Sequence, residues 1–164
     1  ELFYYFIDKF KDVVPLLFEN YSYDSKLLEI ACKYNRIKPF YSIMNSEKIS
    51  LNTNFTNCIF MAATSNSIEM CNYLIDQKLS INYTSLIQKI ANVAKISREV
   101  ILLIFNKSGL EISKSLLLPL LNPAIKSHNQ YLVDFICEKN IFYDECLINA
   151  VSALDIDIIN IILK

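Results

Sequence analysis

The sequence contains a single glycine, Gly109, among its 164 residues, whereas an average protein contains about 7% glycine. Tight hairpins rely on glycine because it adopts positive φ without steric cost. A fold built from many short strands is therefore disfavoured, and Asn, Asp, Ser and Pro must form the turns. The same scarcity excludes a glycine-rich loop that binds nucleotide phosphates.

Long apolar runs are also missing. The longest, residues 100–105 and 116–121, fall far short of the roughly 18 residues that a membrane-spanning helix needs. Charged residues between 8 and 12 interrupt the start of the chain, which is untypical of a signal peptide. We therefore predict that the chain does not insert into a membrane.

An excess of charge of one sign is absent as well. The net charge is −1, with both signs spread along the chain, so no basic face is predicted for nucleic acid. The odd number of cysteines, without a C-x-x-C pair, favours reduced, buried thiols and a cytoplasmic location. Four Asn-x-Ser/Thr sequons suggest secretion instead, and we attribute them to chance in a chain rich in Asn, Ser and Thr. The cysteines are Cys32, Cys58, Cys71, Cys137 and Cys146, and the sequons begin at Asn20, Asn54, Asn82 and Asn106.

Residues for catalysis or metal binding are few. The only histidine, His128, would need Cys137 as a nucleophile and a third group to orient it, so we predict an exposed turn residue instead. Cys58 and Cys71 have no partners for a tetrahedral metal site. We predict no enzymatic activity, no metal and no cofactor.

A repeated pattern runs through the chain: a small residue, a break that contains Asn or Asp, and then an apolar helical stripe. In four copies the small residue precedes a central apolar residue by 12 positions. These pairs are Ala31 with Ile43, Ala62 with Leu74, Ala124 with Ile136, and Ala150 with Ile162. A fifth copy, Ala91 to Ile104, is one residue longer, and Tyr5 with Leu17 completes a sixth.

This pattern predicts an all-α fold of stacked antiparallel helix pairs, because such short helices bury their apolar faces only against neighbours. A residue with positive φ is expected between the helices of a pair, at Asn35 and Asn66 and near His128 and Leu154. Short extended fingers are expected between some pairs, at 49–52, 79–83 and 110–113. The predicted single domain, 1–164, comprises pairs at 2–20, 25–52, 55–83, 84–113, 115–143 and 145–164.

Residues 55–83 resemble an ankyrin repeat, through the double alanine Ala62-Ala63, the run Ile68-Glu69-Met70-Cys71 and the closing Ile81-Asn82. Residues 27–52 are the next best match. The family's Thr-Pro-Leu-His tetrapeptide is absent, and Asn66 and Lys78 replace its two glycines. Pro119 and Pro123 bracket a helix that the family leaves unbroken. These departures leave a solenoid of the HEAT or tetratricopeptide kind as the alternative.

The resemblance implies a module that binds another protein through a rigid concave face of fingers and first helices. On this sequence the face would include Lys33, Tyr34, Asn54, Thr64, Ser65, Tyr83, Thr84, Lys95, Lys126 and Ser127. The alternative function is a structural segment of a larger assembly, because residues 2–10 and 156–163 are apolar at both ends. The chain has no initiating Met and stops within the pattern, so we expect a fragment of a longer protein.

Overall fold

The structure, a computed structural model, describes residues 25–45, 55–139 and 143–163. These residues form ten α-helices and no strand, so the all-α prediction is confirmed for them. The predicted pair at 2–20 lies outside the described residues. The helices are α3 (Ser25–Lys33), α4 (Ile37–Met44), α5 (Phe55–Thr64), α6 (Ile68–Asp76), α7 (Tyr83–Ala91), α8 (Arg98–Ser108), α9 (Lys114–Lys126), α10 (Gln130–Cys137), α11 (Tyr143–Ser152) and α12 (Ile156–Ile162).

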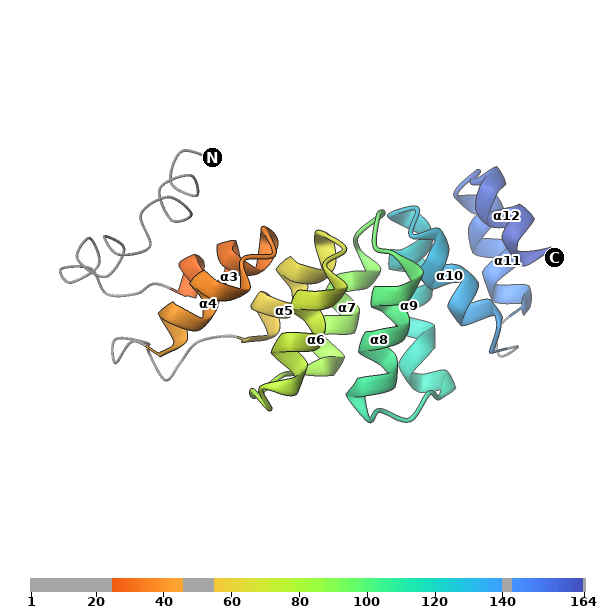
Figure 1. Ribbon diagram of the computed structural model, residues 1–164. Helices are drawn as coiled ribbons and strands as arrows, with labels where there is room; N and C mark the ends of the chain where they lie inside the picture. The colour runs from red at the N-terminus through yellow and green to blue at the C-terminus, as the bar shows by residue number, and fades with distance from the viewer. Residues whose placement is uncertain (1–24, 46–54, 140–142, 164) are drawn as a thin grey trace.

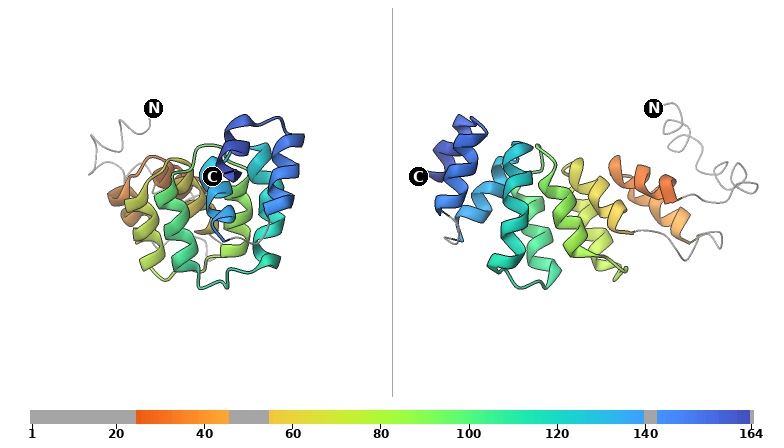
Figure 2. Two further views of the ribbon diagram at one scale, coloured as in Figure 1. Left: turned by 90° about the vertical axis from the view of Figure 1, so that its right-hand side faces the viewer. Right: turned by 180° about the vertical axis from the view of Figure 1, so that it is seen from behind.

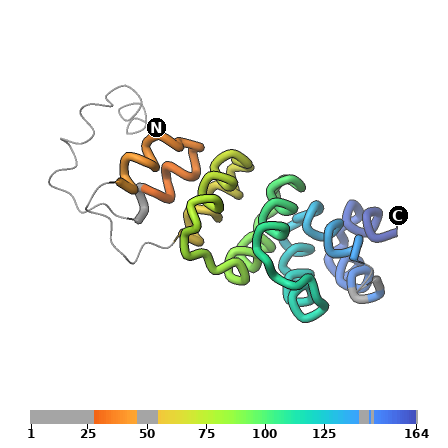
Figure 3. Tube along the Cα trace, turned by 60° about the horizontal axis from the view of Figure 1, so that its bottom comes forward, coloured from red at the N-terminus to blue at the C-terminus, as the bar shows by residue number. Residues whose placement is uncertain are grey.

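The helices pack as consecutive pairs that follow one another along an elongated row (Figures 1 and 3). The first helix of each pair contacts the first helix of the next, from α3 through α5, α7 and α9 to α11. The second helices α6, α8, α10 and α12 form a parallel series of contacts. The first and second helices therefore form two layers, which Figure 2 shows from the end of the row and from behind.

The core lies between these two layers and contains the residues of the 12-residue pattern. The four small alanines are at most 4% exposed, and the four apolar residues that follow them are at most 5% exposed. An alanine allows two first helices to approach closely, and the apolar residue fills the space behind it. The sequence pattern therefore predicted these eight core residues correctly.

The turns within the pairs share one geometry. Asn35, Asn66, His128 and Leu154 have φ between 53° and 56°, as the pattern predicted. The residue after each of them donates its amide hydrogen to the carbonyl of the small alanine, as in Ser67 to Ala62 at 3.0 Å. The equivalent bonds end on Ala31, Ala124 and Ala150. This arrangement satisfies carbonyls at the end of the first helix that would otherwise lack partners.

The same residue that closes the turn usually starts the second helix. The side chains of Ser67, Asn129 and Asp155 accept hydrogen bonds from the amides three residues later, and Ser97 does the same for α8. Each fills the N-cap position, where a short polar side chain satisfies a free amide. One residue therefore both ends one helix and begins the next.

The turn between α7 and α8 differs from the others. Residues 92–97 separate the two helices, which agrees with the longer spacing in this copy of the pattern. The Ala91 carbonyl here accepts the Ser127 hydroxyl at 2.8 Å, from the following pair. In the other turns the equivalent alanine carbonyl accepts a backbone amide of its own turn, whereas here the hydrogen-bond donor comes from the neighbouring pair.

The connections between pairs are irregular. Residues 77–82 and 109–113 link helices without strands, and the predicted finger at 49–52 lies outside the described residues. Tyr83, predicted in a finger, is instead the first residue of α7, because the side chain of Asn82 caps that helix through the Ser85 amide. Lys78 and Gly109 both have positive φ, 53° and 65°, at the start of these connections.

Two prolines were expected to bracket a helix, and this expectation was wrong. Pro119 and Pro123 both lie inside α9. Each removes one helical hydrogen-bond donor, but five side chains of this helix are buried and hold it against its neighbours. They are Leu117, Leu120, Leu121, Ala124 and Ile125. Pro39 lies at the third residue of α4, in the first turn, where the absence of an amide hydrogen costs little.

Candidate interaction surface

The turns within the pairs line up along one edge of the row, the upper edge in Figure 1. We call residues 34–36, 65–67, 92–97, 127–129 and 153–155 the turn edge. Each of these segments lies at the end of a first helix, and the first four expose polar side chains. At 153–155 the only polar side chain, Asp155, is buried and Leu154 is 84% exposed. The turn edge is therefore a polar border of the first-helix layer as far as the turn after α9.

Side chains link each turn on this edge to the next pair. Asn35 Nδ2 donates to Glu69 Oε2 at 3.5 Å, at the start of α6. Asn66 Nδ2 donates to the Lys95 carbonyl at 2.8 Å, and its Oδ1 accepts the Ser97 amide at 2.6 Å. The amide side chain of Asn66 thus fixes both ends of the short segment before α8.

The links continue into the second half of the chain. Asn129 Nδ2 donates to the Ile90 carbonyl at 3.1 Å, and the Asn129 side chain is fully buried. At the next turn, His128 Nδ1 lies 2.5 Å from Asp155 Oδ2. These contacts join residues 27 to 39 positions apart, so the turn edge is held as a unit.

Asp155 is the one carboxylate of the turn edge, and its side chain is only 6% exposed. Burial alone would raise the pKa of this carboxyl. The Ile158 amide, which donates to Oδ1 at 3.1 Å, and the His128 ring offset that effect and hold the pKa below its usual value. Asp155 therefore stays ionised in the range where proteins normally work, and its charge stabilises the start of α12.

The first-helix layer also carries a polar ladder across its surface. Asn57 Nδ2 on α5 donates to Glu29 Oε1 on α3 at 3.0 Å. Asn57 Oδ1 accepts from Lys89 Nζ on α7 at 2.5 Å, and this ammonium group lies 5.9 Å from the centre of the Phe60 ring. Three successive first helices are thereby connected.

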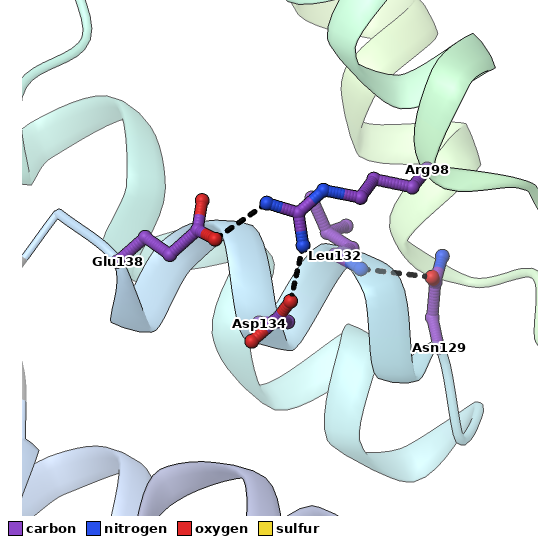
Figure 4. A network of polar contacts seen from close by, with 5 residues as sticks. All are labelled: Arg98, Asn129, Leu132, Asp134 and Glu138. Carbon is purple, nitrogen blue, oxygen red and sulfur yellow. Dashed lines mark hydrogen bonds and ion pairs between the residues drawn. The ribbon is translucent and has the colours of Figure 1, made fainter. Parts of the chain in front are cut away.

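The second-helix layer has a different kind of link. Arg98 at the start of α8 forms hydrogen-bonded ion pairs with Asp134 and Glu138 of the next pair, each at 2.5 Å (Figure 4). Lys107 lies 3.8 Å from Asp76 in the same layer. The basic residues of α8 are therefore already paired with carboxylates. These ion pairs were not predicted from the sequence, because they join residues of neighbouring repeats that are far apart along the chain.

Seven of the ten predicted interface residues lie together on or beside the turn edge. Each is at the end of a first helix or in the turn that follows it. They are Lys33, Tyr34, Thr64, Ser65, Lys95, Lys126 and Ser127. Lys33, Thr64, Lys95 and Lys126 recur at intervals of 31 residues, so the sequence did contain a signal for this row.

The other three predicted residues lie elsewhere. Tyr83 and Thr84 occupy the opposite end of their helix, at the start of α7, and Asn54 lies outside the described residues. Tyr83 is half-buried, and burial raises the pKa of its hydroxyl. Tyr34, by contrast, is 46% exposed. The structure therefore separates two tyrosines that the sequence placed on one face.

A shallow, open depression lies between the ends of α7 and α9. Its lining is Asn92, Asn122, Pro123, Lys126 and Ser127. Lys126 and Ser127 were predicted as interface residues, whereas the two asparagines were missed. No periodic signal marks them, because Asn92 belongs to the irregular turn and Asn122 is an ordinary exposed residue of α9.

The remaining reactive groups are buried or paired with one another. All five cysteines are free thiols, and four of them are buried. Burial raises the pKa of Cys71 to about 12. Hydrogen bonding to Cys58 and Cys146, respectively, raises the pKa of Cys32 and Cys137 well above the usual thiol range. Within the described ranges, no group of three or more His, Cys, Asp or Glu residues is placed to hold a metal ion.

No helix in the described part of the chain has the length and apolar content to span a bilayer. The chain matches no protein-family model, and comparison with curated proteins and with solved structures found no significant match. Its function has to be inferred from its own residues.

Proposed function

We propose that this chain is a non-catalytic protein–protein interaction module, an ankyrin-type solenoid that presents its first-helix layer and turn edge to a partner protein. The observation that carries this proposal is the linkage of successive turns by side-chain hydrogen bonds. A surface that is held before binding loses little conformational entropy when a partner docks. The free thiols support a cytoplasmic setting for this interaction.

The ankyrin-type reading is supported by backbone geometry. Asn66 and Lys78, which replace the family's two glycines, both have φ of 53°. Residues other than glycine seldom adopt positive φ, and lysine has no special tendency to do so. That both positions keep this conformation favours a chain that diverged from a glycine-containing repeat over an unrelated helical stack.

The proposal predicts that Tyr34→Ala weakens binding of a partner that is first captured from cell extract and then purified. Tyr34 lies on the turn edge and exposes 46% of its surface, and a tyrosine at an interface often contributes strongly to affinity. Tyr131→Ala is the matched control, because Tyr131 is 50% exposed but lies on the second helix α10.

We expect the first substitution to raise Kd about tenfold or more and the second to change it less than about twofold. Isothermal titration calorimetry measures both values, and unchanged melting temperatures verify the fold. Equal effects of the two substitutions would argue against the turn edge as the binding surface.

A second candidate function, a structural segment covered by another subunit or helix pair, is favoured by the apolar surface of α11 and α12. The residue after the small alanine is buried in three pairs, as Cys32, Ala63 and Ile125, but Val151 is 52% exposed. Leu163 is likewise 56% exposed. In the earlier pairs the following helices lie against this side of the pair (Figure 1).

Light scattering of the purified chain at increasing concentration tests this second function. We expect self-association through the uncovered surface, and Val151→Lys should reduce it, because a charged side chain resists burial in an apolar contact. A chain that remains monomeric throughout the concentration range would contradict a role that depends on covering this end.

A further inference from the structure

The charged residues of the central three pairs are divided unequally between the two layers. The first helices α5, α7 and α9 and the turns that follow them, residues 55–67, 83–97 and 114–129, contain no Asp or Glu. Their charged residues are all lysines: Lys89, Lys95, Lys114 and Lys126. The second helices of the same pairs carry both signs, with the acidic residues Glu69, Asp76, Glu99 and Asp134 outnumbering the basic residues Arg98 and Lys107.

Two of these lysines are available on or directly beside the turn edge. Lys95 and Lys126 are exposed, and in the described part of the chain neither forms an ion pair. The Lys95 backbone is fixed by Asn66, and Lys126 precedes Ser127, whose hydroxyl is bonded to Ala91 at 2.8 Å. Both ammonium groups therefore extend from anchored backbone.

The depression between α7 and α9 includes one of these lysines. Lys126 forms part of its lining, together with the exposed side chains of Asn92 and Asn122. Asn92 Nδ2 already donates to the Gln88 carbonyl at 2.9 Å, which leaves its second N–H for a ligand. An ammonium group forms a charge-assisted hydrogen bond with a carboxylate, and amide N–H groups donate to it as well. The depression thus has the chemistry to receive an Asp or Glu side chain of a bound chain.

We propose that the turn edge, centred on Lys95, Lys126 and this depression, binds an acidic, extended segment of a partner protein. This inference rests on the proposed interaction function and specifies the chemistry of its partner. The segment would run along the row, with one carboxylate in the depression and others near the lysines. Lys33 extends the same row at the first described turn.

An acidic protein segment fits this surface better than a nucleic acid does. Nucleic-acid affinity grows with the number of phosphates that cationic residues neutralise, and the central turn edge offers two separate lysines without an arginine. A long polyanion that extended beyond the first-helix face would also meet a layer in which Arg98 and Lys107 are already paired with carboxylates.

The spacing of the carboxylates follows from the geometry of the row. Packed helices lie about 8–10 Å apart, and a chain in the extended polyproline II conformation advances about 3.1 Å per residue with three residues per turn. A carboxylate at every third residue then lies on one face of the segment and recurs about every 9 Å, so that successive carboxylates would meet successive pairs. The probe is a fluorescein-labelled peptide of about twelve residues with Glu at every third position, long enough to cover the central pairs at that rise. A second peptide carries Gln at the same positions.

Fluorescence anisotropy at low ionic strength, where surface charges are least screened, measures binding of both peptides to the whole chain. We expect the Glu peptide to bind at least about tenfold more tightly than the Gln peptide, which corresponds to about 1.4 kcal/mol. Lys95→Glu with Lys126→Glu should abolish this preference, and Lys95→Gln with Lys126→Gln should reduce it. The control, Lys38→Glu with Lys107→Glu, makes the same change in net charge on second helices and should preserve the preference.

Equal affinity for the Glu and Gln peptides would overturn the inference. So would a control variant that loses the preference for the Glu peptide as fully as the Lys95 and Lys126 variant does. So would the absence of any binding of the Glu peptide to a folded chain. A natural partner that binds the Lys95→Gln, Lys126→Gln variant normally but fails to bind the Tyr34→Ala variant would also overturn the inference. This result would leave the proposed interaction function intact. Failure of that function has a different signature, namely a partner that binds the Tyr34 and Tyr131 variants equally.

Discussion

Replacing Leu74 with alanine should destabilise the chain by about 2–5 kcal/mol, the range for removing a buried leucine side chain. Leu74 lies in α6, is fully buried, and belongs to a helix that packs against both α5 and α8. Removal of its side chain leaves a cavity between these helices. The surrounding side chains are closely packed and cannot move in to fill it. Urea denaturation followed by far-UV circular dichroism measures the change in the free energy of unfolding.

Leu118→Ala provides the matched control, because it is the same chemical change at a residue of α9 that is 41% exposed. Its effect should stay within about 0.5–1 kcal/mol, since surface substitutions seldom cost more. Equal destabilisation by the two variants would contradict the assignment of Leu74 to the core. It would also undermine the 12-residue pattern, because the apolar end of that pattern would then not be a packing position.

The sequence predicted the helix pairs and their turns because both depend on short-range rules. A small residue, a residue able to adopt positive φ and an apolar stripe all lie within one repeat, so their spacing can be read directly. Leu154 is the informative case, because leucine does not favour positive φ and yet the repeat placed this conformation at Leu154-Asp155, where Leu154 adopts it.

The contacts between repeats were less predictable. Asn66 binds the segment before α8 and Arg98 binds two carboxylates of α10, and no local pattern specifies which residues of different pairs meet. The position of Pro119 inside a helix was mispredicted for a similar reason. The tendency of proline to end a helix concerns one helix alone, whereas α9 continues through Pro119 because it packs against its neighbours.

The candidate surface was predictable in part for the same reason. Lys95 and Lys126 were found because the repeat places them at equivalent turns, 31 residues apart. Asn92 and Asn122 were missed because the depression that they line forms only when α7 and α9 pack together. The separation of charge between the two layers likewise becomes visible only when each helix is assigned to its layer.

Asn129→Ala should destabilise the chain by about 1.5–3 kcal/mol, because one buried side chain makes two bonds that stabilise different pairs. Its Oδ1 accepts the Leu132 amide at 3.2 Å and caps α10, while its Nδ2 donates to the Ile90 carbonyl at 3.1 Å. Loss of a cap costs about 0.5–2 kcal/mol, and loss of the second hydrogen bond adds about 1 kcal/mol. The Val93 amide also donates to the Ile90 carbonyl, so that oxygen keeps one partner and the added cost stays modest.

Two further variants separate these contributions in the same urea experiment. Asn129→Ser keeps an N-cap oxygen but is too short to reach Ile90, so it should cost about 1 kcal/mol. Ser67→Ala removes a cap alone, at the start of α6, and should also cost about 1 kcal/mol. If Asn129→Ala cost no more than Ser67→Ala, the bond to Ile90 would contribute nothing. The side-chain links of the turn edge would then follow from the stacking of the pairs without helping to hold them together.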